Sequence, residues 1–499
     1  MEKLKTDVAV LGTGAGGFSA ALTAVEGGAR VILFDKRSVF GGNSMNPLGT
    51  FAVESKLQRQ NNVPITRDEI FKLVMERTHW QADARLWKAY IDKTASTIEW
   101  LEQHGVEFEL WPFYSYGPYL TGHVVKAPYD RMDKFSFLMK VLREKAQGLG
   151  AEIRLATPGK KLVKDGGAIT GLIAEGESGQ EISVDAKAVI IASGGFADNK
   201  EMVKEHLGFE PGVDYPVSPR PDSWMNGDGI RMAWEAGAAS DGMCLQLIYG
   251  TATRMVRFDK GEQKGAREAL SAINNERYIF PWINQDGVRF LDEGICQDVA
   301  YPANAIARQK GRCAYMIFDS NIKKYLEEET FDNVLLIFPP TTKPEVVDVD
   351  ALFRICSEQG DKSMIAADSL AGLARGIGVK PDVMEKTIDE YNGFCAKGVD
   401  ELFCKNPHYL RPVKNPRFYA VKLGNSATGT LGGIKINDRA EVINTQGDII
   451  PGLYAAGDCA NGATSYDFWI AHGLPGNPSS FALNTGRIAA ENALKYMGK

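Results

Sequence analysis

The stretch DVAVLGTGAGGFSAALTAVE, residues 7–26, decides the fold class. Its first part, Asp7–Leu11, is a short apolar run, which is typical of a strand buried on both faces of a parallel sheet. The run stops at a glycine-rich turn, and Phe18–Glu26 then has the alanine-rich pattern of a helix that packs closely on such a sheet. A second apolar run, Ala29–Phe34 (ARVILF), follows. The order strand, turn, helix, strand predicts an α/β fold with a Rossmann-like sheet.

The glycine-rich turn GTGAGG, residues 12–17, fits a dinucleotide-binding fingerprint. In it, Gly12 would turn the chain, Gly14 would let the backbone approach a pyrophosphate, and Gly17 would allow close contact between helix and strand. The free N–H groups at the start of the helix would bind the phosphates. Asp35, eighteen residues after Gly17, lies where an acid accepts hydrogen bonds from the ribose hydroxyls. These residues leave open whether the nucleotide is FAD or NAD.

Composition and charge exclude several classes of protein. The chain has 499 residues, 44% hydrophobic and 24% charged, as in a globular protein with a sizeable core. Its formal net charge is −6 and it has no basic run, so we expect no nucleic-acid groove. Seven scattered cysteines without a CxxC pair predict reduced thiols, and neither a metal site nor a haem. The first residues lead directly into a strand, and no apolar run could span a bilayer, so we expect a cytoplasmic protein without a membrane partner.

Further segments carry a resemblance to a known family. They are FGGNS at Phe40–Ser44, AVIIASGGF at Ala188–Phe196, NGDGI at Asn226–Ile230, a helical stretch at Ser369–Phe403 and GLYAAGD at Gly452–Asp458. Together they resemble, in the same order, the FAD-dependent fumarate reductase and succinate dehydrogenase flavoprotein family, which also contains urocanate reductase and 3-ketosteroid dehydrogenase. The resemblance covers nearly the whole chain and implies an FAD enzyme. It implies non-covalent FAD, because the first segment lacks the histidine that covalently flavinylated members carry.

The resemblance also implies an architecture and a set of cofactor-binding residues. A discontinuous FAD-binding domain would be formed by residues 1–239 and 429–499, and residues 240–428 would form an inserted α+β capping domain. The positions that match the family's FAD-binding residues are Gly12, Gly14, Ala15, Gly16, Gly17, Asp35, Lys36, Gly41, Gly42, Asn43, Ser44, Ser193, Gly194, Asp228, Gly457, Asp458, Asn477, Ser479 and Ser480.

Three sites that carry cations in dicarboxylate-reducing members are neutral in this chain. Gln297 stands where the family has the arginine that protonates the alkene carbon, and glutamine has no proton to give near neutral pH. Thr428 and Gly429 stand in place of a histidine pair, and Gly473 replaces a carboxylate-binding arginine. A buried carboxylate has to be paired with a cation. The resemblance and these departures therefore predict a neutral, hydrophobic small-molecule substrate.

An aromatic stretch and a few polar side chains are the candidates for substrate binding and catalysis. The stretch LWPFYSYGPYL, residues 110–120, either packs the domain or forms a flat wall for a polycyclic or phenolic substrate. Hydride transfer requires a proton at the neighbouring atom, and Gln297 cannot supply it. We expect His472 to be the best placed donor, then Tyr466, with Tyr114 or Tyr116 behind them, and ordered water as the alternative.

The leading hypothesis is an FAD-dependent oxidoreductase acting on CH–CH groups. It would reduce an activated C=C bond, or remove an adjacent C–O, in a neutral cyclic or aromatic molecule of the polyphenol, isoflavonoid or steroid-like kind, by hydride transfer from flavin N5. The alternatives are a 3-ketosteroid-type dehydrogenase, a fumarate-type carboxylate reductase and a non-catalytic flavin electron-transfer subunit. Electrons would come from NAD(P)H, a reduced free flavin or an electron-donor protein, and nothing in the sequence chooses among them.

Overall fold

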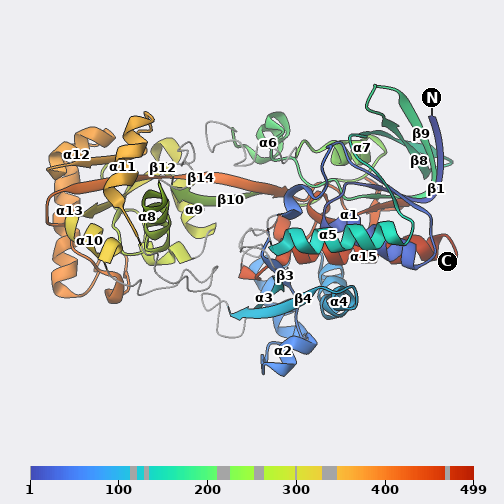
Figure 1. Ribbon diagram of the computed structural model, residues 1–499, viewed down its shortest axis with the longest axis horizontal. Coiled ribbons are helices and arrows are strands. Elements are labelled where there is room, and N and C mark those ends of the chain that lie inside the picture. The colour runs from blue at the N-terminus through green and yellow to red at the C-terminus, as the bar shows by residue number, and fades with distance from the viewer. Residues whose placement is uncertain are drawn as a thin grey trace. The chain divides into compact units, whose positions relative to one another are not determined.

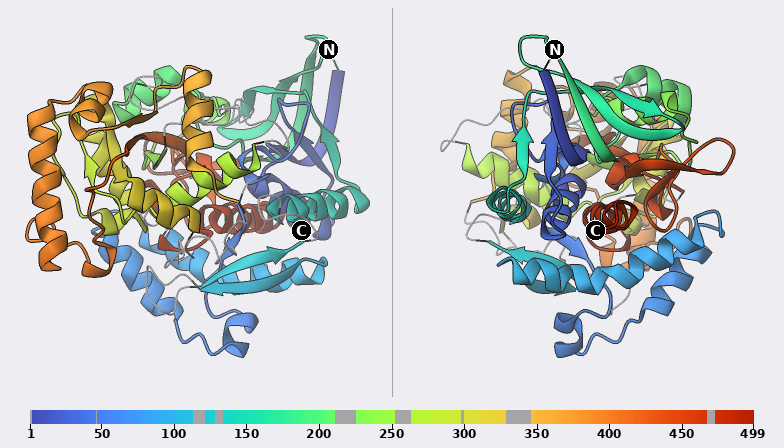
Figure 2. Two further views of the ribbon diagram at one scale, coloured as in Figure 1. Left: turned by 60° about the vertical axis from the view of Figure 1, so that its left-hand side comes forward. Right: turned by 90° about the vertical axis from the view of Figure 1, so that its right-hand side faces the viewer.

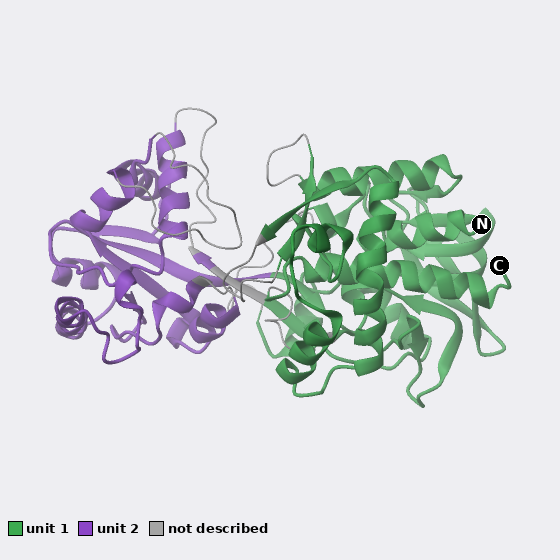
Figure 3. Cartoon of the chain, turned by 90° about the horizontal axis from the view of Figure 1, so that it is seen from below, with its two compact units in different colours: residues 1–210, 220–246, 428–499 green, residues 211–219, 247–427 purple. Residues whose placement is uncertain are grey.

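The chain divides into two compact units (Figure 3). The computed structural model, shown in Figures 1 and 2, describes residues 2–45, 47–112, 121–127, 134–210, 225–251, 263–297, 300–328, 346–466 and 473–499. The first unit comprises Met1–Glu210, Arg220–Gln246 and Thr428–Lys499, and the second unit mainly Leu247–Ala427. The boundaries predicted after residues 239 and 428 are boundaries between domains, which a division into compact units does not test. They stay predictions.

The first unit holds the glycine-rich turn. Its strands are β1 (Glu2–Leu11), β2 (Val31–Phe34), β3 (Gly49–Phe51), β4 (Glu107–Pro112), β5 (Thr121–Lys126), β6 (Glu152–Arg154), β7 (Gly159–Asp165), β8 (Ala168–Glu175), β9 (Glu181–Ile191), β15 (Glu441–Ile443) and β16 (Ile449–Ala455). Its helices are α1 (Ala15–Glu26), α2 (Lys56–Gln60), α3 (Arg67–Arg77), α4 (Ala84–Gln103), α5 (Lys134–Gly148), α6 (Lys200–Leu207), α7 (Asp228–Glu235) and α15 (Asn477–Tyr496).

A parallel sheet forms the core of the first unit. In space the strands follow the order β6–β2–β1–β9–β16, with β15 antiparallel on β16 and the β7–β8 hairpin on β9. In Figure 2 the blue N-terminal strand lies beside green β9, with which it pairs in parallel. From β1 the chain continues to β2 and β6 on one side of the sheet, whereas β9 and β16 lie on the other side. In open α/β sheets, ligands bind at such a switch point, outside the carboxyl ends of the strands. The predicted α/β class with a Rossmann-like sheet is confirmed.

The strand predicted at Asp7–Leu11 is longer than expected. It begins at Glu2, because Glu2 already pairs with Ile182 of β9, a partner that the local pattern could not reveal. Helix α1 covers the sheet and packs on α15 (Figure 1). At their crossing a Cβ atom on Gly486 would lie 2.3 Å from the carbonyl oxygen of Gly16, so only glycine allows this approach.

The second unit is built on an antiparallel sheet. Its strands are β10 (Cys244–Thr251), β11 (Trp282–Ile283), β12 (Cys313–Asp319), β13 (Met364–Ala367) and β14 (Phe418–Leu431), in the order β10–β14–β12–β11 with β13 on β14. Its helices are α8 (Lys264–Asn275), α9 (Ala300–Ala307), α10 (Ser320–Glu328), α11 (Val349–Glu358), α12 (Leu370–Ile377) and α13 (Pro381–Lys397). The helical stretch expected at Ser369–Phe403 is α12 and α13, which Ser369 and Pro381 begin and two left-handed glycines end.

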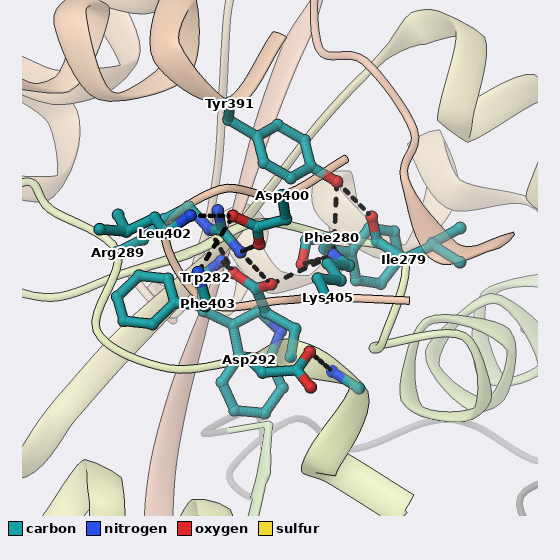
Figure 4. Close-up of polar contacts among 12 residues, drawn as sticks. Ile279, Phe280, Trp282, Arg289, Asp292, Tyr391, Asp400, Leu402, Phe403 and Lys405 are labelled. Carbon is teal, nitrogen blue, oxygen red and sulfur yellow. Dashed lines mark hydrogen bonds and ion pairs between the residues drawn. The ribbon is translucent and has the colours of Figure 1, made fainter. Parts of the chain in front are cut away.

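Four charged side chains are buried together in the second unit (Figure 4). This charge cluster consists of Arg289, Glu293, Asp400 and Lys405, whose side chains are at most 2% exposed. Arg289 donates to both Glu293 oxygens at 2.8 and 2.7 Å and to Asp400 at 2.7 Å. Lys405 lies 3.2 Å from Glu293 and also donates to the Tyr391 hydroxyl at 3.3 Å. Two cations therefore balance two carboxylates, as burial of charge requires.

Candidate functional site

A cavity lies where the carboxyl ends of the parallel strands meet in the first unit. Its volume is about 1150 Å³, including space open to solvent. The segments that follow β1, β2, β9 and β16 all line it, as do residues from the FGGNS segment and the start of α15. Of the predicted cofactor-binding residues, all line the cavity except Gly17, Gly41, Asn477 and Ser480. The fold thus gathers these separated segments around one space that suits a long ligand.

Backbone geometry explains the glycines of the turn in two different ways. Gly12 has φ of +108°, and a Cβ there would lie 2.3 Å from the Ala192 carbonyl oxygen. A Cβ on Gly17 would lie 1.9 Å from the Gly12 oxygen, so both positions need glycine for the fold itself. At Gly14, which lines the cavity, the nearest atom would be Ser44 Oγ at 3.4 Å, an ordinary contact. Close approach of a ligand is therefore the remaining reason for glycine there.

The FGGNS segment packs against the start of α1. Ser44 Oγ accepts a hydrogen bond from the backbone N–H of Ala15 at 3.0 Å, and the Gly41 N–H donates to the Thr13 carbonyl at 3.2 Å. Asn43 donates from Nδ2 to the carbonyl of Thr428 at 3.2 Å. Gly42, Asn43 and Ser44 reach the cavity from this position. The segment is thus held beside the helix end that attracts phosphates.

Acidic residues mark one end of the cavity, after β2. Asp35 accepts hydrogen bonds from the Thr13 N–H at 3.0 Å and hydroxyl at 2.5 Å, and from the Arg37 N–H at 2.9 Å. Lys36 forms an ion pair with Asp228 at 2.6 Å. Burial opposes ionisation of Asp228, but Lys36 and Arg231 hold its pKa below the usual value. At this end of the cavity, the ribose hydroxyls of a dinucleotide would donate hydrogen bonds to Asp35, as expected from the sequence.

Ser193 and Asp458 are two polar residues elsewhere on the cavity wall. Ser193 Oγ is buried and has no hydrogen-bond partner among the residues that the structure describes. Gly194 beside it has φ of +75° with open space where a Cβ would stand. Asp458 is half-buried, and burial raises the pKa of its carboxyl to about 7. A buried hydroxyl needs a partner, so these groups fit a ligand that carries hydroxyls and phosphates, as FAD does.

The start of α15 contributes less to the cavity than we predicted. Ser479 lines it, although its hydroxyl donates to the Gly49 carbonyl at 2.7 Å. Asn477 accepts a hydrogen bond from the buried Tyr90 hydroxyl at 2.6 Å, and Ser480 donates to the Phe51 carbonyl at 2.7 Å. These two side chains bind α15 to α4 and β3. Their predicted contact with the flavin stays a prediction.

Most predicted catalytic residues lie outside the described part of the chain. His472, Tyr114 and Tyr116 fall there, and so does the side chain of Gln297, at the end of a short 3-10 helix that Glu293 begins. Tyr466 is described. Its hydroxyl donates a short hydrogen bond to Asp241 Oδ1, and Asp241 was not singled out from the sequence. Their roles stay predictions.

Sequence reasoning also missed other residues of the cavity. Thr13 holds Asp35, and Met225, Pro47 and Pro478 line the wall. Thr13 could have been noticed, because it stands inside the glycine-rich turn and carries a hydroxyl. Nothing in the local pattern marks Met225, which reaches the cavity through tertiary structure alone. Among the described residues, no group of three or more His, Cys, Asp and Glu could hold a metal ion.

These features define a dinucleotide-binding α/β protein, and comparison with known proteins gives its family. A model of the FAD binding domain family matches residues 7–477. The chain is 30% identical to vinyl phenol reductase from Lactiplantibacillus plantarum, over 98% of this chain and 96% of that protein. It is 29% identical to the cytochrome-type fumarate reductase of Shewanella frigidimarina, over 99% and 78%. The open form of a flavocytochrome c3 fumarate reductase aligns with a TM-score of 0.72 at 26% identity, over 99% and 78%.

The chain therefore belongs to the FAD-dependent fumarate reductase and succinate dehydrogenase flavoprotein family. It is an FAD-dependent oxidoreductase acting on CH–CH groups. None of the described helices combines the length and the apolar character needed to cross a bilayer.

Proposed function

We propose that this enzyme reduces an activated C=C bond in a neutral, cyclic or aromatic small molecule. A relative named vinyl phenol reductase matches the chain along nearly its whole length, which supports an aromatic alkene as the substrate class. A relative named fumarate reductase is almost as similar, so identity alone does not decide between a neutral and a charged substrate. The charge of the side chains near the cavity is the evidence that distinguishes a neutral substrate from a charged one.

The observation that carries the proposal is the neutral surrounding of Gly429. A Cβ there would lie 3.4 Å from Gln246 Oε1, 3.5 Å from Asn43 Nδ2 and 3.7 Å from Met225 Sδ. Asn43 and Met225 line the cavity. The Thr428 hydroxyl donates to Gln246 Oε1 at 3.0 Å. Amides, a hydroxyl and a thioether cannot compensate the desolvation of a dicarboxylate, whereas they suit a neutral ligand.

The chain's own residues would hold FAD along the cavity. Asp35 would accept hydrogen bonds from the ribose, and the N–H groups at the start of α1 would bind the pyrophosphate. Ser193 would pair with a further hydroxyl or phosphate oxygen, and Asp458 would accept a hydrogen bond from a cofactor hydroxyl. When bound and reduced, FAD supplies the hydride. We leave the electron donor open among NAD(P)H, a reduced free flavin and a donor protein.

Anaerobic reoxidation of the photoreduced holoenzyme tests the proposal. We expect neutral aryl alkenes to reoxidise the flavin at least about a hundredfold faster than fumarate or urocanate, a difference of about 2.7 kcal/mol in the barrier. Equal or faster reoxidation by the carboxylates would contradict a neutral substrate. Reduction of the oxidised flavin by saturated ketones, without reoxidation by any alkene, would instead indicate the 3-ketosteroid-type dehydrogenase. Failure of every compound to react would indicate an electron-transfer subunit.

A further inference from the structure

Tyr466 and Asp241 form a hydrogen-bonded pair in the first unit. The Tyr466 hydroxyl donates to Asp241 Oδ1, and Asn461 Nδ2 donates to the other carboxylate oxygen at 3.1 Å. Both members of the pair are half-buried, so neither is sealed inside the core. A second tyrosine–aspartate pair, Tyr419 with Asp350 at 3.2 Å, lies in the second unit and serves below as a matched control.

The pair is connected to the cavity wall through backbone hydrogen bonds. The N–H of Gly432 donates to the carbonyl of Asp458, which lines the cavity, at 2.9 Å. The next N–H, of Gly433, donates to the carbonyl of Asp241 at 3.1 Å. A Cβ on Gly432 would lie 1.3 Å from the Gly242 oxygen, so the two backbones are in direct contact. The segment Gly432–Gly433 therefore connects the Asp241 backbone with Asp458 on the cavity wall.

The direction of the Tyr466 hydrogen bond determines what its oxygen can do. A phenolic hydroxyl has one proton, and in Tyr466 that proton is directed at Asp241. Toward any other group the oxygen can act only as an acceptor. Burial, and then the Asp241 carboxylate, raise the pKa of Tyr466 above its usual value, so its hydroxyl is protonated before a ligand binds. A ligand hydroxyl would complement this oxygen, and a ligand carbonyl would not.

We propose that Tyr466 and Asp241 recognise and deprotonate a hydroxyl group on the substrate, which is a hydroxylated aryl alkene. This inference rests on the proposed function and names its substrate more narrowly. The phenolic proton passes to Tyr466 as the tyrosine proton passes to Asp241. The electron pair released from the O–H bond moves through the ring, and the terminal alkene carbon takes a proton from water, which leaves as hydroxide. The product is a neutral quinone methide, formed without net oxidation or reduction.

The proton shift prepares the alkene for reduction. An electron-rich hydroxystyrene does not accept a hydride, whereas the quinone methide is electrophilic at the carbon next to the ring. FAD, when bound and reduced, would supply a hydride to that carbon and so restore the aromatic ring, and Asp241 would return the proton to the phenolate oxygen through Tyr466. The pair is thus a general base in the first step and a general acid in the last.

Hydrogen exchange into the alkene tests the pair without reduction. The holoenzyme with oxidised FAD is incubated with 4-hydroxystyrene in D₂O, and the terminal vinyl protons are followed by NMR. We expect the wild type to exchange them, and Tyr466→Phe and Asp241→Asn to slow this exchange by about a hundredfold. Tyr419→Phe should exchange at the wild-type rate. 4-Methoxystyrene, which has no hydroxyl proton, should not exchange.

Exchange of 4-methoxystyrene as fast as 4-hydroxystyrene would overturn the inference, and so would wild-type exchange rates in both variants. The comparison of these two alkenes uses only the wild type and remains decisive where a variant fails to fold. Flavin reoxidation by the two alkenes distinguishes failure of this inference from failure of the proposed function. If both alkenes reoxidise the flavin equally fast, the proposed function holds and the role of Tyr466 and Asp241 falls. If neither does, the proposed function itself falls.

Discussion

The cavity of the first unit and the charge cluster of the second unit differ in how their polar groups are paired. In the cluster, Arg289 and Lys405 are matched by Glu293 and Asp400, and all four are buried. On the cavity wall, Lys36 and Asp228 form an ion pair, glycine backbone and the Asp35 and Asp458 carboxyls also line the cavity, and Ser193 Oγ has no partner among the described residues. Groups that satisfy one another serve the fold, whereas a group left unsatisfied on a cavity wall awaits a ligand. The hydroxyl without a partner among the described residues, and not the most concentrated charge, therefore marks the candidate site.

Breaking the charge cluster should give the largest effect. Glu293→Gln leaves Arg289 and Lys405 with one carboxylate between them, and we expect it to lower the free energy of unfolding by about 3–5 kcal/mol. Urea denaturation followed by tryptophan fluorescence measures this. The control is Glu401→Gln, which removes the exposed partner of Lys397 and should cost less than about 1 kcal/mol. Equal stability of the two variants would show that the cluster does not hold the second unit.

The Asp458 carboxyl on the cavity wall should make the free energy of unfolding of the apoprotein depend on pH. In the unfolded chain its pKa is about 3.9, and burial raises it to about 7 in the folded apoprotein. The folded state therefore holds the proton more tightly, and stability falls as the pH rises from about 4 to about 7. Between pH 5 and pH 8 we expect the wild-type apoprotein to lose about 2 kcal/mol relative to Asp458→Asn. Parallel pH profiles of the two proteins in urea denaturation would contradict this.

Gly14 should separate ligand binding from folding. A methyl group at Gly14 meets no protein atom closer than 3.4 Å, so Gly14→Ala should leave the apoprotein as stable as the wild type. It should weaken FAD binding by about tenfold, or about 1.4 kcal/mol, because the backbone can no longer approach the pyrophosphate. Fluorescence titration of the apoprotein with FAD gives the affinity. Gly12→Ala is the contrast, since its methyl group would lie 2.3 Å from Ala192 oxygen and must destabilise the fold. Unchanged FAD affinity in Gly14→Ala would remove this residue from the site.

Ser193 offers the smallest and most specific effect. Ser193→Ala removes a buried hydroxyl that has no partner among the described residues, so the apoprotein should not lose stability, while FAD affinity should fall by about 0.5–1.5 kcal/mol. Ser19→Ala is the control, because Ser19 Oγ donates to the Gly16 carbonyl at 3.1 Å inside α1. That variant should lose stability instead. The opposite pattern would mean that Ser193 serves the fold.

The first unit could be predicted from sequence because its chemistry is local. The turn at residues 12–17 brings its own strand and helix, and FGGNS and GLYAAGD stand at the ends of other elements. The turn therefore indicated a ligand site by itself, whereas the roles of FGGNS and GLYAAGD were implied by the family resemblance. The length of β1 could not be predicted, since it depends on pairing with Ile182.

The charge cluster and the Tyr466–Asp241 pair could not be predicted. Arg289 and Asp400 are 111 positions apart, and Tyr466 and Asp241 are 225 apart, so no periodicity joins them. Their pairing is decided by how β-strands and loops pack in three dimensions. For the same reason, the neutral contacts of Gly429 with Gln246 and Met225 became visible only in the structure, although the absence of a histidine at Gly429 was plain in the sequence.

The central claim is that the substrate that binds beside FAD carries no negative charge. Equilibrium titration of the oxidised holoenzyme tests it directly, with the flavin difference spectrum as the signal. Fumarate and 4-hydroxystyrene are titrated under the same conditions of pH and salt. The account predicts a saturable spectral change with 4-hydroxystyrene and none with fumarate at the same concentrations. Tighter binding of fumarate, weakened by added salt as for a cation-bound anion, would contradict it.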